Sequence, residues 1–434
     1  MTRPERRQSN SGGVRLKKEQ TDQHARRPGL RRFAFAVALA FTATLPALAI
    51  RLGGLHPPAI AAVGVFGVSI IGAGFMLSWG AEAAEGHVAQ GVAIAGLALI
   101  TVLPEYAIDI YYTLRAGAAP GSDYVQFAAA NMTGANRLLI GLGWPLIAVL
   151  YWWRSKQPFV PLRPANAVEI AFLAVASMYS FVIVLKNQID LVDTLILALL
   201  FVAYLWRLSR LAREPDDDDV EVGPAAALGH VSTSGQWMAI AGLAVSAAVV
   251  ILLAAEPFAE SLLVSGSQLG VDRFFLVQWV APLAGEAPEV VITILFALAL
   301  RPTAALGALI SDKINQWTLL VGFIPLFFSL ARGALHPFPL DARQHEEFFL
   351  TAAQSVFAVS LLLRLRLDLA GAAGLFGLFT VQFTLALVNQ NNEAATITTL
   401  TALGWLYIAL ALVLVARDRQ ALVERTRFGL LNRT

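Results

Sequence analysis

The feature that most restricts the fold of this chain is a series of apolar stretches, each about as long as a bilayer is thick. A helix needs about 20 apolar residues to cross the hydrocarbon core. Of the 434 residues, 57% are apolar and only 14% are charged, which excludes a soluble domain. The sequence therefore predicts an all-α, polytopic membrane protein. We expect twelve transmembrane helices, at residues 33–50, 58–79, 91–114, 124–152, 167–185, 190–209, 236–256, 274–300, 304–330, 347–364, 371–388 and 397–416.

The distribution of Lys and Arg predicts how these helices are oriented. With a cytoplasmic N-terminus, 24 of the 32 basic residues fall in cytoplasmic segments, six fall outside, and two, Arg137 and Lys313, fall within helices. Cytoplasmic loops of membrane proteins carry the excess of basic residues. We therefore expect a multi-pass protein of the cell (plasma) membrane with both termini in the cytoplasm.

Two of the apolar stretches contain a proline that is followed directly by a glutamate, Pro104-Glu105 in one and Pro288-Glu289 in the other. Proline removes a helical hydrogen bond, and a carboxylate at the centre of the bilayer costs roughly 2.5 to 3.5 kcal/mol on insertion scales. Polar residues follow each motif in the next apolar stretch, which indicates a duplicated unit. Two broken helices would then meet near the midplane around one buried cation site.

The parity of the helices makes the two copies inverted. Helices two to six and helices seven to eleven form groups of five, and an odd number forces the second copy to cross in the opposite direction. Residues 33–50 could also form a cleaved signal peptide, although an uncleaved helix is favoured. We divide the chain into a basic cytoplasmic tail (1–32), an extra transmembrane helix (33–57), a first inverted repeat (58–210), an acidic cytoplasmic linker (211–235), a second inverted repeat (236–390), and a last transmembrane helix with a basic tail (391–434).

The two Pro-Glu segments and the polar residues after them resemble the alpha-repeats of the sodium/calcium exchanger family, which belongs to the calcium/cation antiporter superfamily. In the first copy Thr101 precedes Pro104-Glu105, and residues 134–136 (Gly-Ala-Asn) follow in the next helix. In the second copy residues 285–289 are followed by residues 311–315. The resemblance implies ten core helices in two inverted halves. It also implies exchange of calcium or a related cation against sodium or protons by alternating access.

The same resemblance implies which side chains bind the cation. Glu105 and Glu289 match the acidic residue that follows proline in each family repeat, so they would be the principal ligands of a metal ion. The sequence departs from the family at Ala135 and Leu139, where the family often has serine and asparagine. The first half therefore offers fewer oxygen ligands. The expected cation-binding residues are Glu105, Glu289, Glu286, Asp312, Asn315, Ser311, Thr101 and Asn136.

Two bases, Arg137 and Lys313, occupy equivalent places in the two repeats. A fixed cation beside a metal site weakens the binding of divalent ions, so we expect these bases to compensate negative charge. Either they are paired permanently with nearby acids (Glu105, Asp109, Glu286 or Asp312), or they exchange partners as protons or sodium arrive. Five acids (Glu105, Asp109, Glu286, Glu289 and Asp312) against two bases leave a formal excess of three negative charges, which predicts uptake of cations or protons.

Two further pairs of acids, Glu82 with Glu85 and Glu256 with Glu260, lie at comparable places near the end of the first helix of each repeat. Their spacing places each pair on one face of its helix. Each pair forms either a cation entrance or a solvated helix end.

Other classes of protein fit the sequence less well. The six histidines are scattered and no HExxH motif is present, so we expect no enzyme and no catalytic residues. We expect no cofactor and no nucleic-acid partner, only the lipid bilayer and the transported cations. Two alternatives stay open: a sodium/proton exchanger without calcium transport, and a non-transporting membrane sensor or scaffold of transporter origin.

Overall fold

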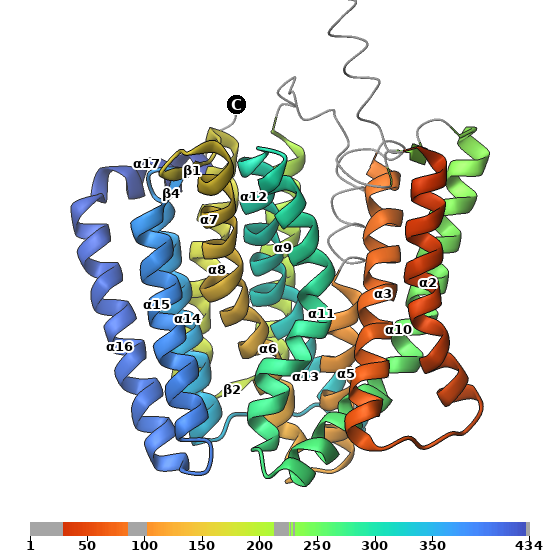
Figure 1. Cartoon of the computed structure of the whole chain (residues 1–434). Helices are drawn as coiled ribbons and strands as arrows, with labels where there is room; N and C mark the ends of the chain where they lie inside the picture. The colour runs from red at the N-terminus through yellow and green to blue at the C-terminus, as the bar shows by residue number, and fades with distance from the viewer. Residues whose placement is uncertain (1–28, 86–101, 212–224, 226, 229–230, 431–434) are drawn as a thin grey trace, which may run out of the picture.

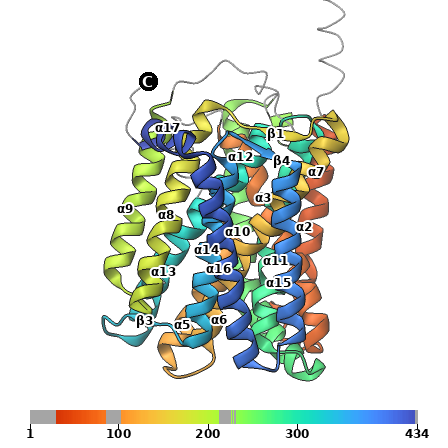
Figure 2. The same cartoon turned by 90° about the vertical axis from the view of Figure 1, so that its left-hand side faces the viewer.

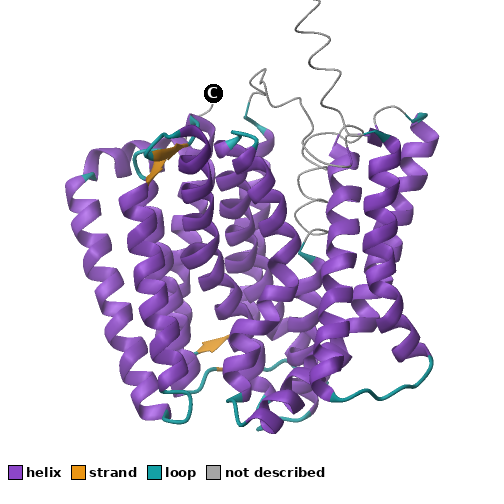
Figure 3. Ribbon diagram, viewed as in Figure 1, coloured by secondary structure: helices purple, strands orange, loops and turns teal. Residues whose placement is uncertain are grey.

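The computed structural model describes residues 29–85, 102–211, 225, 227–228 and 231–430, and this part of the chain is mostly helical (Figures 1 and 3). The first half contains α2 (Leu30–Leu52), α3 (Ala59–Glu85), α5 (Leu103–Ala118), α6 (Tyr124–Leu138), η1 (Leu139–Gly143), α7 (Trp144–Ser155), η2 (Pro164–Asn166), α8 (Ala167–Lys186) and α9 (Leu191–Ser209). The second half contains α10 (Thr233–Leu269), α11 (Arg273–Leu298), α12 (Pro302–Asn315), η5 (Gln316–Leu320), α13 (Val321–Arg332), α14 (Ala342–Leu362), α15 (Leu369–Val388), α16 (Glu393–Arg417) and α17 (Arg419–Leu430).

The prediction of a polytopic, all-α membrane protein is confirmed. Within the described residues, ten helical spans are long and apolar enough to cross a membrane. The other two predicted spans correspond to α5, whose predicted beginning at residues 91–101 lies outside the described residues, and to the more polar α14. Each of the twelve predicted ranges thus overlaps a helix. The tail at residues 1–28 and most of the linker, residues 212–224 included, also lie outside the described part.

Two short β-ribbons show the inverted relationship of the repeats. β1 (Phe159–Pro161), which follows α7, pairs with β4 (Arg366–Asp368), which follows α14. β2 (Gln188–Ile189), which follows α8, pairs with β3 (Phe338–Pro339), which follows α13. Because α7 is equivalent to α13 and α8 to α14, each ribbon is the inverted counterpart of the other. They lie at opposite ends of the bundle, with β1 and β4 at the top and β2 near the bottom in Figure 1.

The helix that carries the second Pro-Glu motif differs from the prediction of two broken helices. α11 is continuous from Arg273 to Leu298 and contains both Pro282 and Pro288, so the predicted break at Pro288 is wrong. In the first repeat α5 begins at Leu103, and the chain before Val102 lies outside the described residues. Irregular backbone also lies in the next helix of each repeat, where the π-helical segments η1 and η5 interrupt α6–α7 and α12–α13. Such π-helical turns often mark functional sites. Here each one begins within three residues of a buried base, Arg137 or Lys313.

The end of one helix also differs from the prediction. α10 does not end near residue 256 but runs on to Leu269, because Phe258 and Leu262 continue its buried face until Gly270 adopts a positive φ of 67°. Glu256 and Glu260 therefore lie inside a helix and not near its end.

The C-terminal segment predicted as a basic tail contains a further helix, α17, which packs against α8 at the top of the view in Figure 2. Arg207 of α9 donates from Nε to the carbonyl of Gly429 at 3.2 Å and from Nη2 to the carbonyl of Phe428 at 3.1 Å. A Cβ atom on Gly429 would come within 2.6 Å of the carbonyl oxygen of Ala167. Glycine at this position therefore permits the close contact between α17 and α8.

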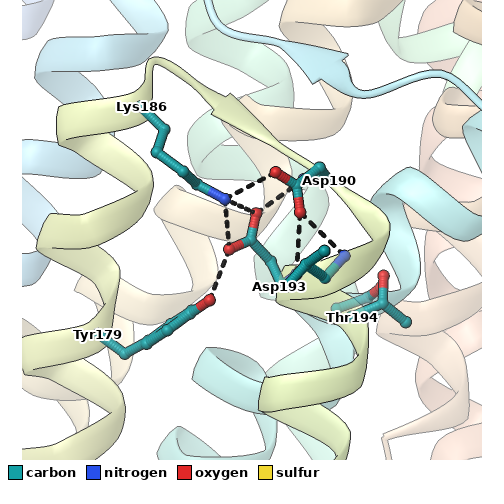
Figure 4. A network of polar contacts seen from close by, with 7 residues as sticks. Tyr179, Lys186, Asp190, Asp193 and Thr194 are labelled. Carbon is teal, nitrogen blue, oxygen red and sulfur yellow. Dashed lines mark hydrogen bonds and ion pairs between the residues drawn. The ribbon is translucent and has the colours of Figure 1, made fainter.

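At the opposite end of the bundle, an ion-pair network holds the connection between α8 and α9 (Figure 4). Lys186 Nζ lies 2.8 Å from Asp190 Oδ2 and 2.6 Å from Asp193 Oδ2, and Tyr179 donates to Asp193 Oδ1 at 2.6 Å. Asp190 also caps α9 by accepting hydrogen bonds from two backbone N–H groups. Burial alone would raise the pKa of Asp190, but the hydrogen bonds from Lys186 and from the backbone hold that pKa below its ordinary value.

We expect Lys186→Met to lower the free energy of unfolding by about 1 to 3 kcal/mol, because it removes the cation from the buried carboxylate of Asp193. Since the pKa of Asp190 is lower in the folded than in the unfolded state, its stabilising effect is present above the unfolded pKa of about 3.9 and is lost as the pH falls through the folded pKa. Thermal unfolding in detergent should therefore show a large difference at neutral pH and a smaller one in acid. Lys156→Met, at an exposed position, is the control; a loss independent of pH would contradict the role given to Asp190.

Candidate functional site

Three carboxyl groups from both repeats lie side by side in the interior of the bundle. Glu105 of α5 and Glu286 of α11 both accept a hydrogen bond from Gln316 Nε2, and both interact electrostatically with Asp312 of α12. These residues, called the carboxyl cluster below, are only 3%, 6% and 7% exposed. Three buried carboxyl groups that interact in this way repel one another when they are charged. Bound protons or a bound cation would remove this repulsion.

The close approach of α5 and α11 brings the two glutamates together. A Cβ atom on Gly285 would lie 3.4 Å from both Cα and Cβ of Glu105, so the glycine before Glu286 lets the helices touch. Gln316, the first residue of η5, connects them further. Its Nε2 donates to Glu286 Oε1 at 2.6 Å and to Glu105 Oε2 at 3.4 Å. The side-chain amide of Gln316 thus stabilises an oxygen that carries negative charge on each of the two glutamates.

Glu289, predicted as the partner of Glu105, lies one turn along α11 from Glu286 and is partly exposed. It interacts electrostatically with Glu286 and Asp312. The structure therefore places Glu286 directly against Glu105 and Glu289 beside the cluster. The reason is the packing of Gly285 on α5, which a Pro-Glu motif does not reveal.

Arg137 does not pair with an acid of the cluster. Its Nη2 atom lies 2.5 Å from Glu347 Oε2 of α14, and both side chains are 1% exposed. The guanidinium also lies over the ring of Trp279, 5.2 Å from its centroid. The predicted permanent pairing of Arg137 with Glu105, Asp109, Glu286 or Asp312 is therefore wrong, because α6 packs on α14 and meets Glu347 there.

Lys313 crosses between the repeats to Asn136. Its Nζ donates to the Asn136 backbone carbonyl at 2.9 Å and to Asn136 Oδ1 at 2.6 Å, and the lysine is fully buried. Asn136, predicted as a cation ligand, thus already binds an ammonium group. Lys313 interacts electrostatically with Asp312, Glu286 and Glu105. It is placed to offset part of the negative charge of the cluster.

The other predicted ligands have different surroundings. Asn315 Oδ1 accepts a hydrogen bond from Tyr106, beside Glu105, at 2.8 Å. Ser311 instead contacts Tyr204 at 2.7 Å and donates to Glu169 Oε1 at 3.4 Å, away from the cluster. Thr101 lies outside the described residues. Asp109, counted among the buried acids, accepts a hydrogen bond from Asn131 at 2.6 Å.

The predicted entrance acids of the second repeat hold helices together at the end of the bundle opposite α17. Arg51 of α2 forms an ion pair of 2.5 Å with Glu256. Glu260 accepts hydrogen bonds from Tyr111 and Tyr124. In the first repeat Glu82 is partly exposed near the end of α3, and the side chain of Glu85 lies outside the described residues.

Sequence reasoning missed two buried acids, Glu169 and Glu347, which are 8% and 1% exposed. Each lies within the first two turns of its helix, and an acidic residue near a helix N-terminus is ordinary because the helix dipole favours it. Their equivalent places in the two repeats are the signal that could have revealed them. Within the described ranges, no group of three acidic or histidine side chains is arranged to hold a metal ion as the protein stands.

Comparison with known proteins shows what the chain is similar to. The sequence model of the family described as "Sodium/calcium exchanger protein" matches residues 58–210 and 238–388. The solved structure of the H+/Ca2+ exchanger CAX has 38% sequence identity and a TM-score of 0.86, over 93% of this chain and 100% of that chain. Native YfkE (13% identity, TM-score 0.57, 82% and 99% covered) and the sodium-calcium exchanger NCX_Mj (15%, 0.52, 75% and 98%) share the fold. No curated protein sequence matches this chain.

Proposed function

The chain belongs to the sodium/calcium exchanger family of cation antiporters, and from this membership we propose that it exchanges calcium, or a related divalent cation, against protons by alternating access. The observation that carries the proposal is the carboxyl cluster. Its three acids come from both repeats, are buried, and interact electrostatically with one another, and Gln316 donates to both glutamates. Glu105 and Glu286 would be the central cation ligands, with Asp312 and Glu289 beside them.

Electrostatics explain why such a cluster would exchange protons for a divalent cation. Two like charges 4 Å apart repel by about 4 kcal/mol at an effective dielectric constant of 20. The empty cluster therefore takes up protons, and Lys313 offsets only one charge. A divalent cation that enters neutralises the same oxygens and releases those protons. Exchange of one for the other keeps the site nearly neutral in both states.

The comparison with known exchangers supports protons over sodium. The H+/Ca2+ exchanger CAX is 38% identical to this chain, whereas the sodium-calcium exchanger NCX_Mj is 15% identical. We also propose that the α17 side faces the cytoplasm of a cell membrane, since the sequence assigns 24 of the 32 basic residues to the segments predicted on that side and six to the other.

Ion flux in liposomes tests the proposal. With purified protein reconstituted and an acidic interior, dilution into neutral buffer with radioactive calcium should drive calcium uptake, and an entrapped pH dye should report proton efflux. Protein-free liposomes give the background. Calcium uptake that follows a sodium gradient without proton movement would show that sodium, and not protons, is exchanged against calcium. Proton movement against sodium without calcium would indicate a sodium/proton exchanger, and background flux under every gradient would favour a sensor or scaffold.

A further inference from the structure

The inverted repeats place two buried glutamates at equivalent positions. Glu169 lies six residues after Arg163, which caps the η2–α8 segment, and Glu347 lies six residues after Asp341, which caps α14. α8 and α14 are equivalent helices. Each carries its glutamate to the equivalent broken helix of the other repeat, α8 to α12 and α14 to α6.

The partners of these two glutamates differ. Glu347 is neutralised by the guanidinium of Arg137. Glu169 accepts hydrogen bonds from neutral groups, Asn166 Nδ2 at 2.6 Å and Ser311 Oγ at 3.4 Å. Within the described part of the chain, no basic side chain forms an ion pair with Glu169. The counterpart of Arg137 in α12 is Lys313, which is directed away to Asn136.

Neutral groups from η2, α12 and α9 lie around the carboxyl group of Glu169. α12 contributes Ser311 and Gly307, where a Cβ atom would lie 3.2 Å from Asn166 Nδ2. α9 contributes Tyr204, the titratable group that faces the site, through its hydrogen bond to Ser311. α17 packs on α8 through Gly429, and Arg207 of α9 points to the α17 carbonyls.

From this geometry we infer that Glu169 is a second proton-binding site, on the α17 side of the bundle and outside the carboxyl cluster. A buried carboxylate without a cation is costly, and a proton is the ligand that neutralises it. Metal binding fits less well, because Asn166 presents its amide hydrogens, and not its oxygen, to the carboxylate. Ser311, which bonds Glu169, directly precedes Asp312 of the cluster. Glu169 is thus positioned to load or release protons for the exchange proposed above, on which this step depends.

Infrared spectroscopy tests the proton site without requiring transport. We expect the wild-type protein in detergent, at neutral pH, to show the carbonyl stretch of a protonated carboxyl group that is missing from Glu169→Gln. Glutamine keeps the size of the side chain and its ability to accept from Ser311, so the variant should fold. Glu393→Gln, at an exposed glutamate, is the matched control and should leave the spectrum unchanged. Identical spectra of wild type and Glu169→Gln would show that Glu169 is ionised and would overturn the inference.

A second variant and a second readout complete the test. Ser311→Ala should shift the frequency of the same band, because it removes a hydrogen bond to Glu169; an unchanged band would contradict the assignment even if Glu169→Gln fails to fold. In liposomes, the pH profile of calcium flux should lose one titration step in Glu169→Gln. If the carbonyl band is lost in Glu169→Gln but neither the wild type nor any variant transports calcium, the proton site stands and the proposed function fails. If transport occurs with an unchanged pH profile and spectrum, only the proton site fails.

Discussion

Glu105→Gln and Glu286→Gln, made separately, should each abolish gradient-driven calcium uptake while the protein stays folded. Each change removes one charged oxygen of the proposed cation site but keeps the shape of the side chain and the hydrogen bond of Gln316 to the remaining oxygen. A hydrogen bond or ligand contact to a charged group is worth about 1.5 to 3 kcal/mol, and each 1.4 kcal/mol is tenfold in affinity. Calcium affinity should therefore fall roughly 10- to 100-fold, as calorimetry in detergent would measure.

The control for this experiment is Glu393→Gln, which neutralises an exposed glutamate at the start of α16 and should transport like the wild type. Glu289→Gln should also abolish uptake, since this carboxylate lies beside the cluster and interacts with both Glu286 and Asp312. Full activity of Glu105→Gln or Glu286→Gln would remove the carboxyl cluster from the transport mechanism. Full activity of Glu289→Gln alone would restrict the ligands to the cluster.

The sequence revealed the transmembrane helices because hydrophobic length is a local property. The sequence around Glu105 also indicated a functional site by itself, since a proline and a carboxylate inside an apolar run are both costly. The local sequence could not predict that Glu286, and not Glu289, lies against Glu105. Which turn of α11 faces α5 depends on the contact of Gly285 with Glu105, and this is a property of packing between two distant segments.

Packing between distant segments also explains why the partners of Arg137 and Lys313 could not be predicted from the sequence. Their equivalent positions suggested equivalent roles, yet Arg137 meets Glu347, which is 210 residues away in the sequence, and Lys313 meets Asn136 of the other repeat. Inverted repeats preserve the backbone and permit the side chains to diverge. One copy has consequently formed a closed ion pair, while its counterpart around Glu169 has neutral partners.

The buried ion pair between Arg137 and Glu347 leads to a second prediction with a large expected effect, which concerns the stability of the protein. Arg137→Met should destabilise the protein by about 3 to 5 kcal/mol, because it leaves the carboxylate of Glu347 buried without a partner. Part of the loss also comes from the contact of the guanidinium with the Trp279 ring. Thermal unfolding in detergent, followed by tryptophan fluorescence, measures the change.

The double variant Arg137→Met with Glu347→Leu decides whether the loss comes from the unpaired charge. When both charges are replaced by apolar groups, burial of an ion is no longer required, and most of the stability should return. The two single changes and the double change form a cycle whose coupling free energy should be about 1.5 kcal/mol or more. Additive losses would show that Arg137 and Glu347 stabilise the fold independently. Glu169→Gln, in the equivalent helix, should lower the stability far less, because among the described residues no base is paired with that carboxylate. This contrast would distinguish the ion-paired Glu347 from Glu169, which can take up a proton.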